Sequence, residues 1–154
     1  MATVHKISGD FYEESFTLIA LHSSLRDYSI VYALNMVLGS SFVRASKDLE
    51  LSEYKSFPFF EWQDDQHDRY WTLIANKSIK KELLARDGLF QDDPSFAEHH
   101  LVPEYKEVDY FIKIGHDDDL STSFLVKDLL TVPKIITAYS LDADILKSRN
   151  NLIF

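Results

Sequence analysis

Two segments of the chain share one pattern, a β-type run, then a helix-type run, then a second β-type run, and this restricts the fold more than any other feature. The first, FTLIALHSSLRDYSIVYALNMVLGSSFVRA, begins at Phe16, and the second, YFIKIGHDDDLSTSFLVKDLLTVPKIITAY, begins at Tyr110. His22 aligns with His116, but the helices need an insertion to stay in step, so no duplication is claimed. The pattern predicts an α+β fold: a single, mainly antiparallel sheet with two main helices on one face, in the split-βαβ (ferredoxin-like) arrangement.

An aromatic β-hairpin is expected to elaborate this sheet. Two aromatic-rich runs, 57–62 and 70–75, flank a polar turn at 64–69. The first run carries aromatic residues on both faces of a strand, so either both faces are covered within the monomer or one face meets a partner. Burial within the monomer is the favoured reading, because aromatic burial mainly builds cores.

The clearest strands are predicted over 16–21 and 109–114, where the apolar pattern is that of a sheet. We expect these two strands to be neighbours near the centre of the sheet. The helix after the first strand has Ser24 as its expected N-cap and Gly39 as its expected C-terminal stop.

The whole chain, 1–154, is predicted to form a single domain. Residues 78–101 are expected to be an irregular surface segment, in which SIKKELLARDG could form a short helix. Residues 142–154 are expected to be a C-terminal tail docked on the body, because the chain ends on three apolar residues, Leu152, Ile153 and Phe154.

Charge and composition exclude several functional classes. A net charge of −9 argues against nucleic-acid binding and against docking on anionic membranes. The chain has no cysteine, which removes disulfides, thiolate catalysis and Cys-ligated metals. The first residues, MATVHKISGDFYEESF, show no apolar signal-peptide core, and no apolar run is long enough for a membrane helix. We therefore expect a cytoplasmic protein with no nucleic-acid or membrane partner.

The segment VPEYKEVDY resembles the signature of the IPExxxVDY family, with Val102 in place of Ile. The signature positions are Val102, Pro103, Glu104, Val108, Asp109 and Tyr110. The segments HSSLRDYSIVYALNMVLG, FPFFEW, LIANK and LKSRNNLIF also resemble the family, so the likeness covers nearly the whole chain. The resemblance implies a bacterial origin and, because the family is uncharacterised, no particular activity.

One candidate ligand site follows from the expected topology. If the two strands that precede the helices were parallel neighbours, their C-terminal ends would bring His22, Ser23 and Ser24 close to His116 and Asp117. Helix N-termini favour anions, but the acidic run at 117–119 opposes an anion there. A cation held by the two histidines and an Asp is one reading, and self-capping without any ligand is the favoured one.

Other clusters have ordinary structural readings. Glu104 and Asp109 would point to opposite faces of a strand, so they are expected to be structural and not a catalytic pair. The run DDQHD at 64–68 lacks the spacing of a known metal loop and reads as a solvated turn. Asn35, expected to be partly buried, could bind a ligand or tie down the next loop. No catalytic residue, metal site or cofactor is predicted.

The leading functional hypothesis is a non-catalytic protein-interaction domain with a protein partner or as a homodimer. The second is a small-ligand-sensing domain resembling the ACT type, with an unknown ligand, and the third is an unrecognised enzyme. A pocket with convergent polar groups would favour the second or third hypothesis, whereas an apolar surface patch would favour the first.

Overall fold

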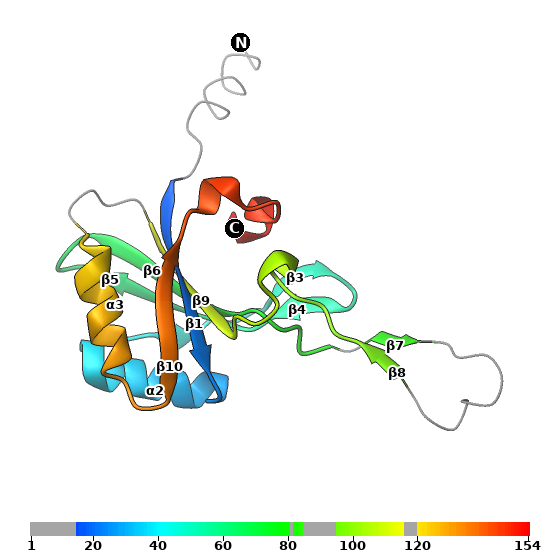
Figure 1. Ribbon diagram of the computed structural model, residues 1–154, viewed down its shortest axis with the longest axis horizontal. Helices are drawn as coiled ribbons and strands as arrows, with labels where there is room; N and C mark the ends of the chain where they lie inside the picture. The colour runs from blue at the N-terminus through cyan, green and yellow to red at the C-terminus, as the bar shows by residue number, and fades with distance from the viewer. Residues whose placement is uncertain (1–14, 81, 85–94, 116–119) are drawn as a thin grey trace, which may run out of the picture.

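The computed structural model describes residues 15–80, 82–84, 95–115 and 120–154. The body is a six-stranded sheet with the order β10-β1-β9-β6-β5-β2 (Figure 1). Its strands are β1 (Phe16–Ser23), β2 (Val43–Arg44), β5 (Phe59–Asp64), β6 (Arg69–Ala75), β9 (Tyr110–Gly115) and β10 (Ile135–Leu141). Every neighbouring pair in this sheet is antiparallel. The α+β class and the mainly antiparallel sheet predicted from the sequence are therefore confirmed.

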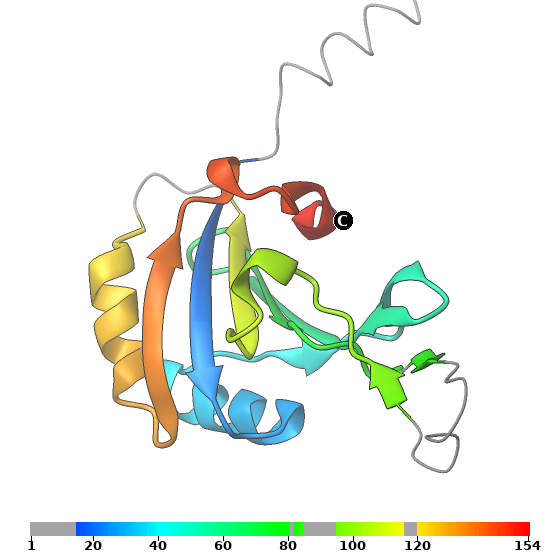
Figure 2. The ribbon, with the colours of Figure 1, turned by 45° about the vertical axis from the view of Figure 1, so that its right-hand side comes forward.

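Two helices, α2 (Asp27–Leu38) and α3 (Thr122–Leu130), pack on the same face of the sheet. Figure 2 shows α3 alongside β10, and α2 near the end of β1. One apolar cluster joins the helices to the strands; its helix members include Ile30, Leu34, Leu125 and Leu129, and its strand members include Ile19, Leu21, Leu73, Ile112 and Ile114. No helix in the described ranges is long and apolar enough to cross a membrane.

The opposite face of the sheet is covered by three short 3-10 helices and the segments around them. They are η1 (Pro103–Tyr105), η2 (Ala143–Ile145) and η3 (Arg149–Leu152). A second apolar cluster joins Leu18, Ala20, Ile74 and Phe111 of the strands to Phe57, Leu101, Val102, Val108, Ala143, Leu146 and Leu152. Each central strand therefore contributes alternate side chains to two separate cores.

The last residues of the chain lie against this second face. Leu152 is fully buried, whereas Ile153 and Phe154 remain 40% and 45% exposed. The Phe154 ring packs against Phe59 with 5.4 Å between ring centroids, and the Lys113 ammonium lies 4.9 Å from the Phe154 centroid. The tail therefore combines one buried anchor with a partly exposed aromatic contact.

The strands predicted over 16–21 and 109–114 are neighbours inside the sheet, as β1 and β9. Their expected parallel direction was wrong. Leu21 lies opposite Tyr110 and Phe16 lies opposite Gly115, so the strands are antiparallel. The C-terminal end of β1 therefore lies beside the start of β9.

Two small hairpins lie outside the main sheet. β3 (Leu49–Ser52) pairs with β4 (Lys55–Phe57), and β7 (Glu82–Leu84) pairs with β8 (Ser95–Ala97). The short helix suggested for SIKKELLARDG was wrong, because Glu82–Leu84 forms a strand. Helical propensity in a short segment is a weak signal, which pairing with a distant strand can override.

The ends of α2 show which local signals were reliable. Gly39 has a φ of 65°, a left-handed conformation that suits glycine at a helix C-terminus, as predicted. The N-cap is Arg26 and not Ser24, and it makes no side-chain capping hydrogen bond.

Candidate functional site

The residues predicted at the end of β1 are engaged in structural contacts. The Ser23 backbone N–H donates to the Asp109 carboxylate at 2.8 Å, and the Ser23 hydroxyl donates to the Lys134 carbonyl at 2.8 Å. The His22 Nε2 lies 2.9 Å from the Tyr139 hydroxyl, whereas Ser24 is exposed. These contacts hold the end of β1 against the residue before β9, the residue before β10 and β10 itself.

The predicted convergence of two histidine-containing turns rested on parallel strands, and that premise was wrong. Gly115, at the end of β9, lies opposite Phe16, so it is at the other end of β1 from His22. His116 and Asp117 follow Gly115 in the sequence and lie outside the described residues.

The signature segment begins with a 3-10 turn and not with a strand. Pro103 stands at the start of η1, and the strand begins only at Tyr110. Val102 and Val108 are buried on the second face of the sheet. The segment between them is thus an arch with apolar anchors at both ends.

The arch is held by Asn76, whose side chain is fully buried. Its amide nitrogen donates to the carbonyls of Tyr105 and Val108, each at 2.8 Å. Its amide oxygen accepts from the Val102 backbone N–H at 2.9 Å. The sequence reasoning missed this role, although the residue lies in LIANK, at the end of an apolar strand, where a buried amide needs partners.

The two signature carboxylates have separate structural partners. Asp109 caps the end of β1 through Ser23, and Glu104 accepts from the Ser148 backbone N–H at 3.1 Å. Burial acts to raise the pKa of Glu104, but hydrogen bonds from Ser148 and from the backbone outweigh it and lower that pKa below its usual range. Glu104 therefore ties the arch to the C-terminal tail as an ionised group.

A pocket of about 320 Å³ opens on the helix-covered face, between the β5–β6 hairpin end, the end of α2 and the start of α3. Its apolar lining residues are Leu38, Trp62, Trp71, Leu120, Phe124 and Leu125, and its polar ones are Asp64, His67, Arg69, Ser121 and Asp128. The indole centroids of Trp62 and Trp71 lie 5.4 Å apart and form one wall. Both tryptophans of the chain therefore line this pocket.

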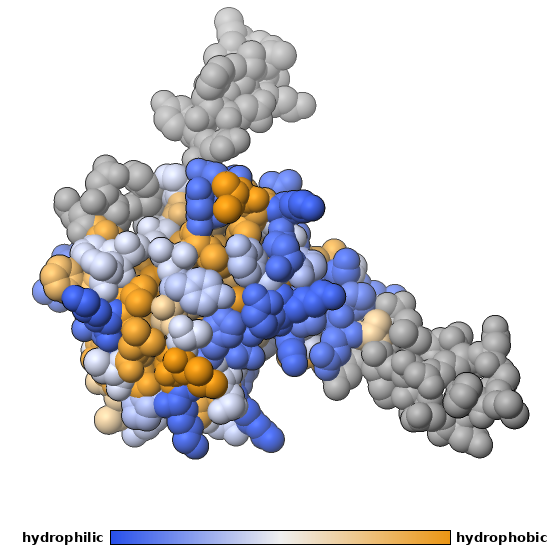
Figure 3. Space-filling view, in the orientation of Figure 1, coloured by the Kyte–Doolittle hydropathy of each residue, from blue (hydrophilic) through white to orange (hydrophobic). Residues whose placement is uncertain are grey.

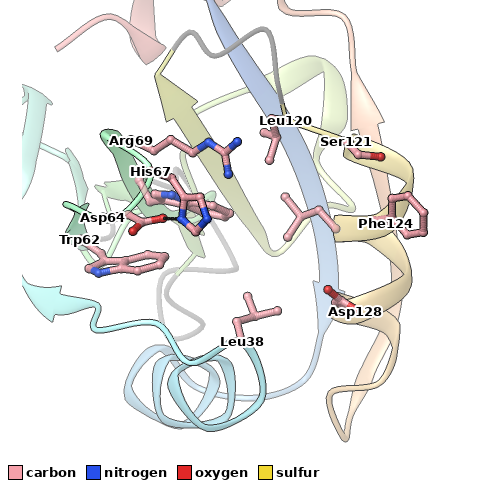
Figure 4. A pocket seen from close by; sticks show the side chains of 11 residues that line it. Leu38, Trp62, Asp64, His67, Arg69, Leu120, Ser121, Phe124 and Asp128 are labelled. Carbon is pink, nitrogen blue, oxygen red and sulfur yellow. Dashed lines mark hydrogen bonds and ion pairs between the residues drawn. The ribbon is translucent and has the colours of Figure 1, made fainter.

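The polar groups of the pocket come from opposite walls. In Figure 4, Asp64, His67 and Arg69 project from the hairpin, and Asp128 projects from α3. The Asp64 carboxylate is buried and lies 2.8 Å from the His67 Nδ1, which fixes the orientation of the imidazole. The run DDQHD was read as a solvated turn, but its first residue is buried in this site.

The pocket has the features of a small-molecule site, namely a concave apolar surface with a few convergent polar groups. Within the described residues, no group of three His, Asp or Glu side chains is placed to hold a metal ion. The arrangement is suited to binding an organic molecule that carries polar or charged groups.

A different kind of candidate surface runs along the outer face of α2. Tyr28, Tyr32 and Met36 follow one another at intervals of four residues, and they are 63%, 68% and 68% exposed. The buried residues of the helix, Ile30, Val31 and Leu34, lie on its other side. We call Tyr28, Tyr32 and Met36 the α2 stripe.

A second, less continuous apolar area lies between α3 and β10. Figure 3 shows hydrophobic surface gathered over this region. Ile136 is 74% exposed and Leu130 is 48% exposed, and Val126 lines a shallow groove beside Ala138. These residues alternate with Lys127, Thr137 and Ser140, so the area is mixed in character.

Comparisons of the chain with protein-family profiles, with curated proteins and with solved structures gave no match.

Proposed function

We propose that this chain is a non-catalytic protein-interaction domain that binds a partner through the α2 stripe. The main observation in support is the composition of α2, DYSIVYALNMVL. Of its twelve residues, only Asp27 is charged. A surface helix normally carries charged side chains on its outer face, and a helix that is apolar all round is normally buried. The α2 stripe is therefore a surface suited to a protein partner.

The residue types in the stripe support the same proposal. Tyrosine and methionine are enriched at protein interfaces, where lysine and glutamate are depleted. Tyrosine supplies a large contact area at a low cost in conformational entropy. Single exposed apolar residues need no explanation, whereas three in a row on one helix face form a contiguous patch, which supports an interaction surface.

We also propose that the chain belongs with the IPExxxVDY family and acts in the bacterial cytoplasm. The signature segment and the absence of cysteine support this placement. For the fold, we propose the split-βαβ arrangement. The order β10-β1-β9-β6 supports it, because β9 and β10, joined by α3, flank β1 on its two sides.

The experiment is a comparison of two matched variants of the full chain as baits in extract of the native host. Tyr32→Glu places a charge in the stripe, and Ile145→Glu places the same charge on a residue that is 72% exposed elsewhere. Wild type and Ile145→Glu are expected to retain the same partner, and Tyr32→Glu is expected to lose it. Equal capture by all three would contradict the proposal.

The second candidate function is small-ligand binding in the pocket beside Trp62 and Trp71. The observation in its favour is the convergence of Asp64, His67 and Asp128 on one cavity from two walls. Because both tryptophans of the chain line the pocket, intrinsic fluorescence reports on its contents without a label.

The test of this alternative is a fluorescence titration with a panel of amino acids, amines and nucleotides. A ligand should change the emission of the wild-type chain at saturable concentrations. The same ligand should bind more weakly to Asp128→Asn and equally well to the control Asp142→Asn, which lies outside the pocket. A panel with no saturable response would remove this candidate for the compounds tested.

A further inference from the structure

We infer that the partner of the α2 stripe is a second copy of this chain, packed with its α2 antiparallel to the first about a twofold axis at Tyr32. The inference rests on the proposed function, because it names the occupant of that surface. Two observations support a second copy: the symmetric spacing of the stripe and the distribution of charge around it.

The stripe is self-complementary. With the axis at Tyr32, the two Tyr32 side chains face each other, and Tyr28 faces the partner's Met36. A twofold interface uses the same patch on both copies, so a row with equal spacing on either side of a central residue meets its requirement.

The charge distribution favours this face for self-association. Each copy carries a net charge of −9, so two copies repel over most of their surfaces. The α2 stripe contains no acidic or basic side chain, which makes it a face where two copies can approach at low electrostatic cost.

Antiparallel packing also complements the ends of the two helices. The last turn of α2 has no basic residue to offset the partial negative charge at its C-terminus. In the proposed register, Arg26 at the start of one helix lies level with the partner's Leu38, at the end of the other helix, and Asp27 lies level with the partner's Val37. Arg26 is exposed, so its guanidinium is available to this C-terminus.

The size of the stripe sets the expected strength. Three side chains about two-thirds exposed offer roughly 400 Å² per copy, which is about half of the ~800 Å² that a standard interface buries on each partner. The dimer is therefore expected to be weak and to depend on protein concentration.

The first test is sedimentation of the full chain from about 1 µM to about 1 mM, a range that spans weak association constants. Wild type and Ile145→Glu are expected to shift from monomer to dimer as concentration rises, and Tyr32→Glu is expected to remain monomeric over the range. Circular dichroism checks that each variant is folded. A wild-type chain that stays monomeric, or a dimer that Tyr32→Glu does not weaken, overturns the inference.

The second test checks the register by oxidative cross-linking, which is clean because the chain has no native cysteine. Tyr32→Cys is expected to cross-link with itself. Tyr28→Cys and Met36→Cys are expected to cross-link when mixed, and much less when each is alone. Equal cross-linking in all combinations, or none in any, overturns the proposed axis.

The two proposals can fail separately. If the wild-type chain stays monomeric but Tyr32→Glu still loses a captured partner, the second copy is wrong and the interaction function stands. If Tyr32→Glu changes neither self-association nor capture, both are wrong.

Discussion

At the residue scale, Asn76 joins the end of β6 to the arch that precedes β9. Besides its three side-chain bonds, its backbone N–H donates to the Asp109 carbonyl at 3.0 Å and its carbonyl accepts from the Leu101 N–H at 2.8 Å. Its side chain donates to the carbonyls of Tyr105 and Val108, which lie outside the sheet, and the Tyr105 carbonyl also accepts from the Val108 N–H at 3.2 Å. The buried amide therefore determines the path of the signature segment.

Asn76→Ala is expected to lower the free energy of unfolding by about 3 kcal/mol, because it removes three hydrogen bonds and leaves buried backbone groups without partners. Urea denaturation measures the change. The control Asn150→Ala removes an exposed amide and should change stability by less than about 0.5 kcal/mol. A loss below about 1 kcal/mol for Asn76→Ala would show that water or a rearranged arch replaces the amide.

Tyr110 provides a pH prediction at the same scale. Burial, with the nearby carboxylates of Asp27 and Asp109, raises its pKa to about 12. Its hydroxyl donates to the Leu25 carbonyl at 2.6 Å. Because the folded pKa lies above the unfolded value of about 10, this group contributes stability that is fully present below pH ~10 and is lost as the pH rises toward 12.

The measurement is the free energy of unfolding against pH for wild type and for Tyr110→Phe. The variant should be less stable at neutral pH, because the Leu25 carbonyl loses its donor, and it should lose less stability between pH ~10 and ~12. Tyr70, whose burial and contact with Glu61 also raise its pKa to about 12, contributes a similar loss in both proteins. Parallel curves for the two proteins would contradict the assignment to Tyr110.

Some residue roles could be predicted from the sequence, and others depend on distant contacts. Asn35 was expected to lie partly buried, and its amide oxygen accepts from the Ser40 hydroxyl at 2.7 Å and the Phe42 N–H at 2.9 Å, which ties down the next loop. Those partners are within seven residues. The partners of Asn76 lie more than twenty-five residues away, so no local pattern points to them.

At the scale of elements, the C-terminal tail offers a direct test of docking. Leu152 is fully buried in the second apolar cluster, whereas Ile153, the next residue, is 40% exposed. Leu152→Ala is expected to cost about 3 kcal/mol, as for buried leucines generally. Ile153→Ala should cost about 1 kcal/mol or less, because less of its surface is buried.

Thermal melting of the two variants decides the point. Deletion of residues 152–154 should lower the melting temperature by at least as much as Leu152→Ala. If Leu152→Ala has the same melting temperature as the wild type, the tail does not dock as described. Its role would then be sought in partner binding.

The positions of strands could be predicted better than their pairing. A short, nearly continuous apolar run located β1, and alternating apolar residues located β9. The direction of the pair could not be read from this alternation, because parallel and antiparallel strands show the same period along the chain. The predicted convergence at His22 rested on a parallel pair, so that argument fails with the antiparallel direction. The pocket at Trp62 is lined by side chains from α2, β5, β6 and α3, which no local pattern brings together.

At the scale of the whole molecule, the two apolar clusters are the two sides of one sheet. In β1, Ile19 and Leu21 face the helices, whereas Leu18 and Ala20 face the tail and the arch. Lys113 of β9 is also buried on the tail side, where its ammonium lies 4.9 Å from the Phe16 and Phe154 ring centroids. Because the same strands carry both clusters, loss of packing on one face is expected to destabilise the other.

The clusters are therefore expected to unfold in one cooperative transition. Trp62 and Trp71 report on the helix side, and an environment-sensitive dye on Ile153→Cys, which is the only cysteine in that variant, reports on the tail side. The two probes should give the same urea midpoint, because coincident transitions are the mark of two-state unfolding. Adding Leu152→Ala should shift both midpoints down together, although the substitution touches only the tail side. A dye transition at lower urea than the tryptophan transition would contradict this coupling, because it would show that the tail and the arch leave the sheet while the helix side stays folded.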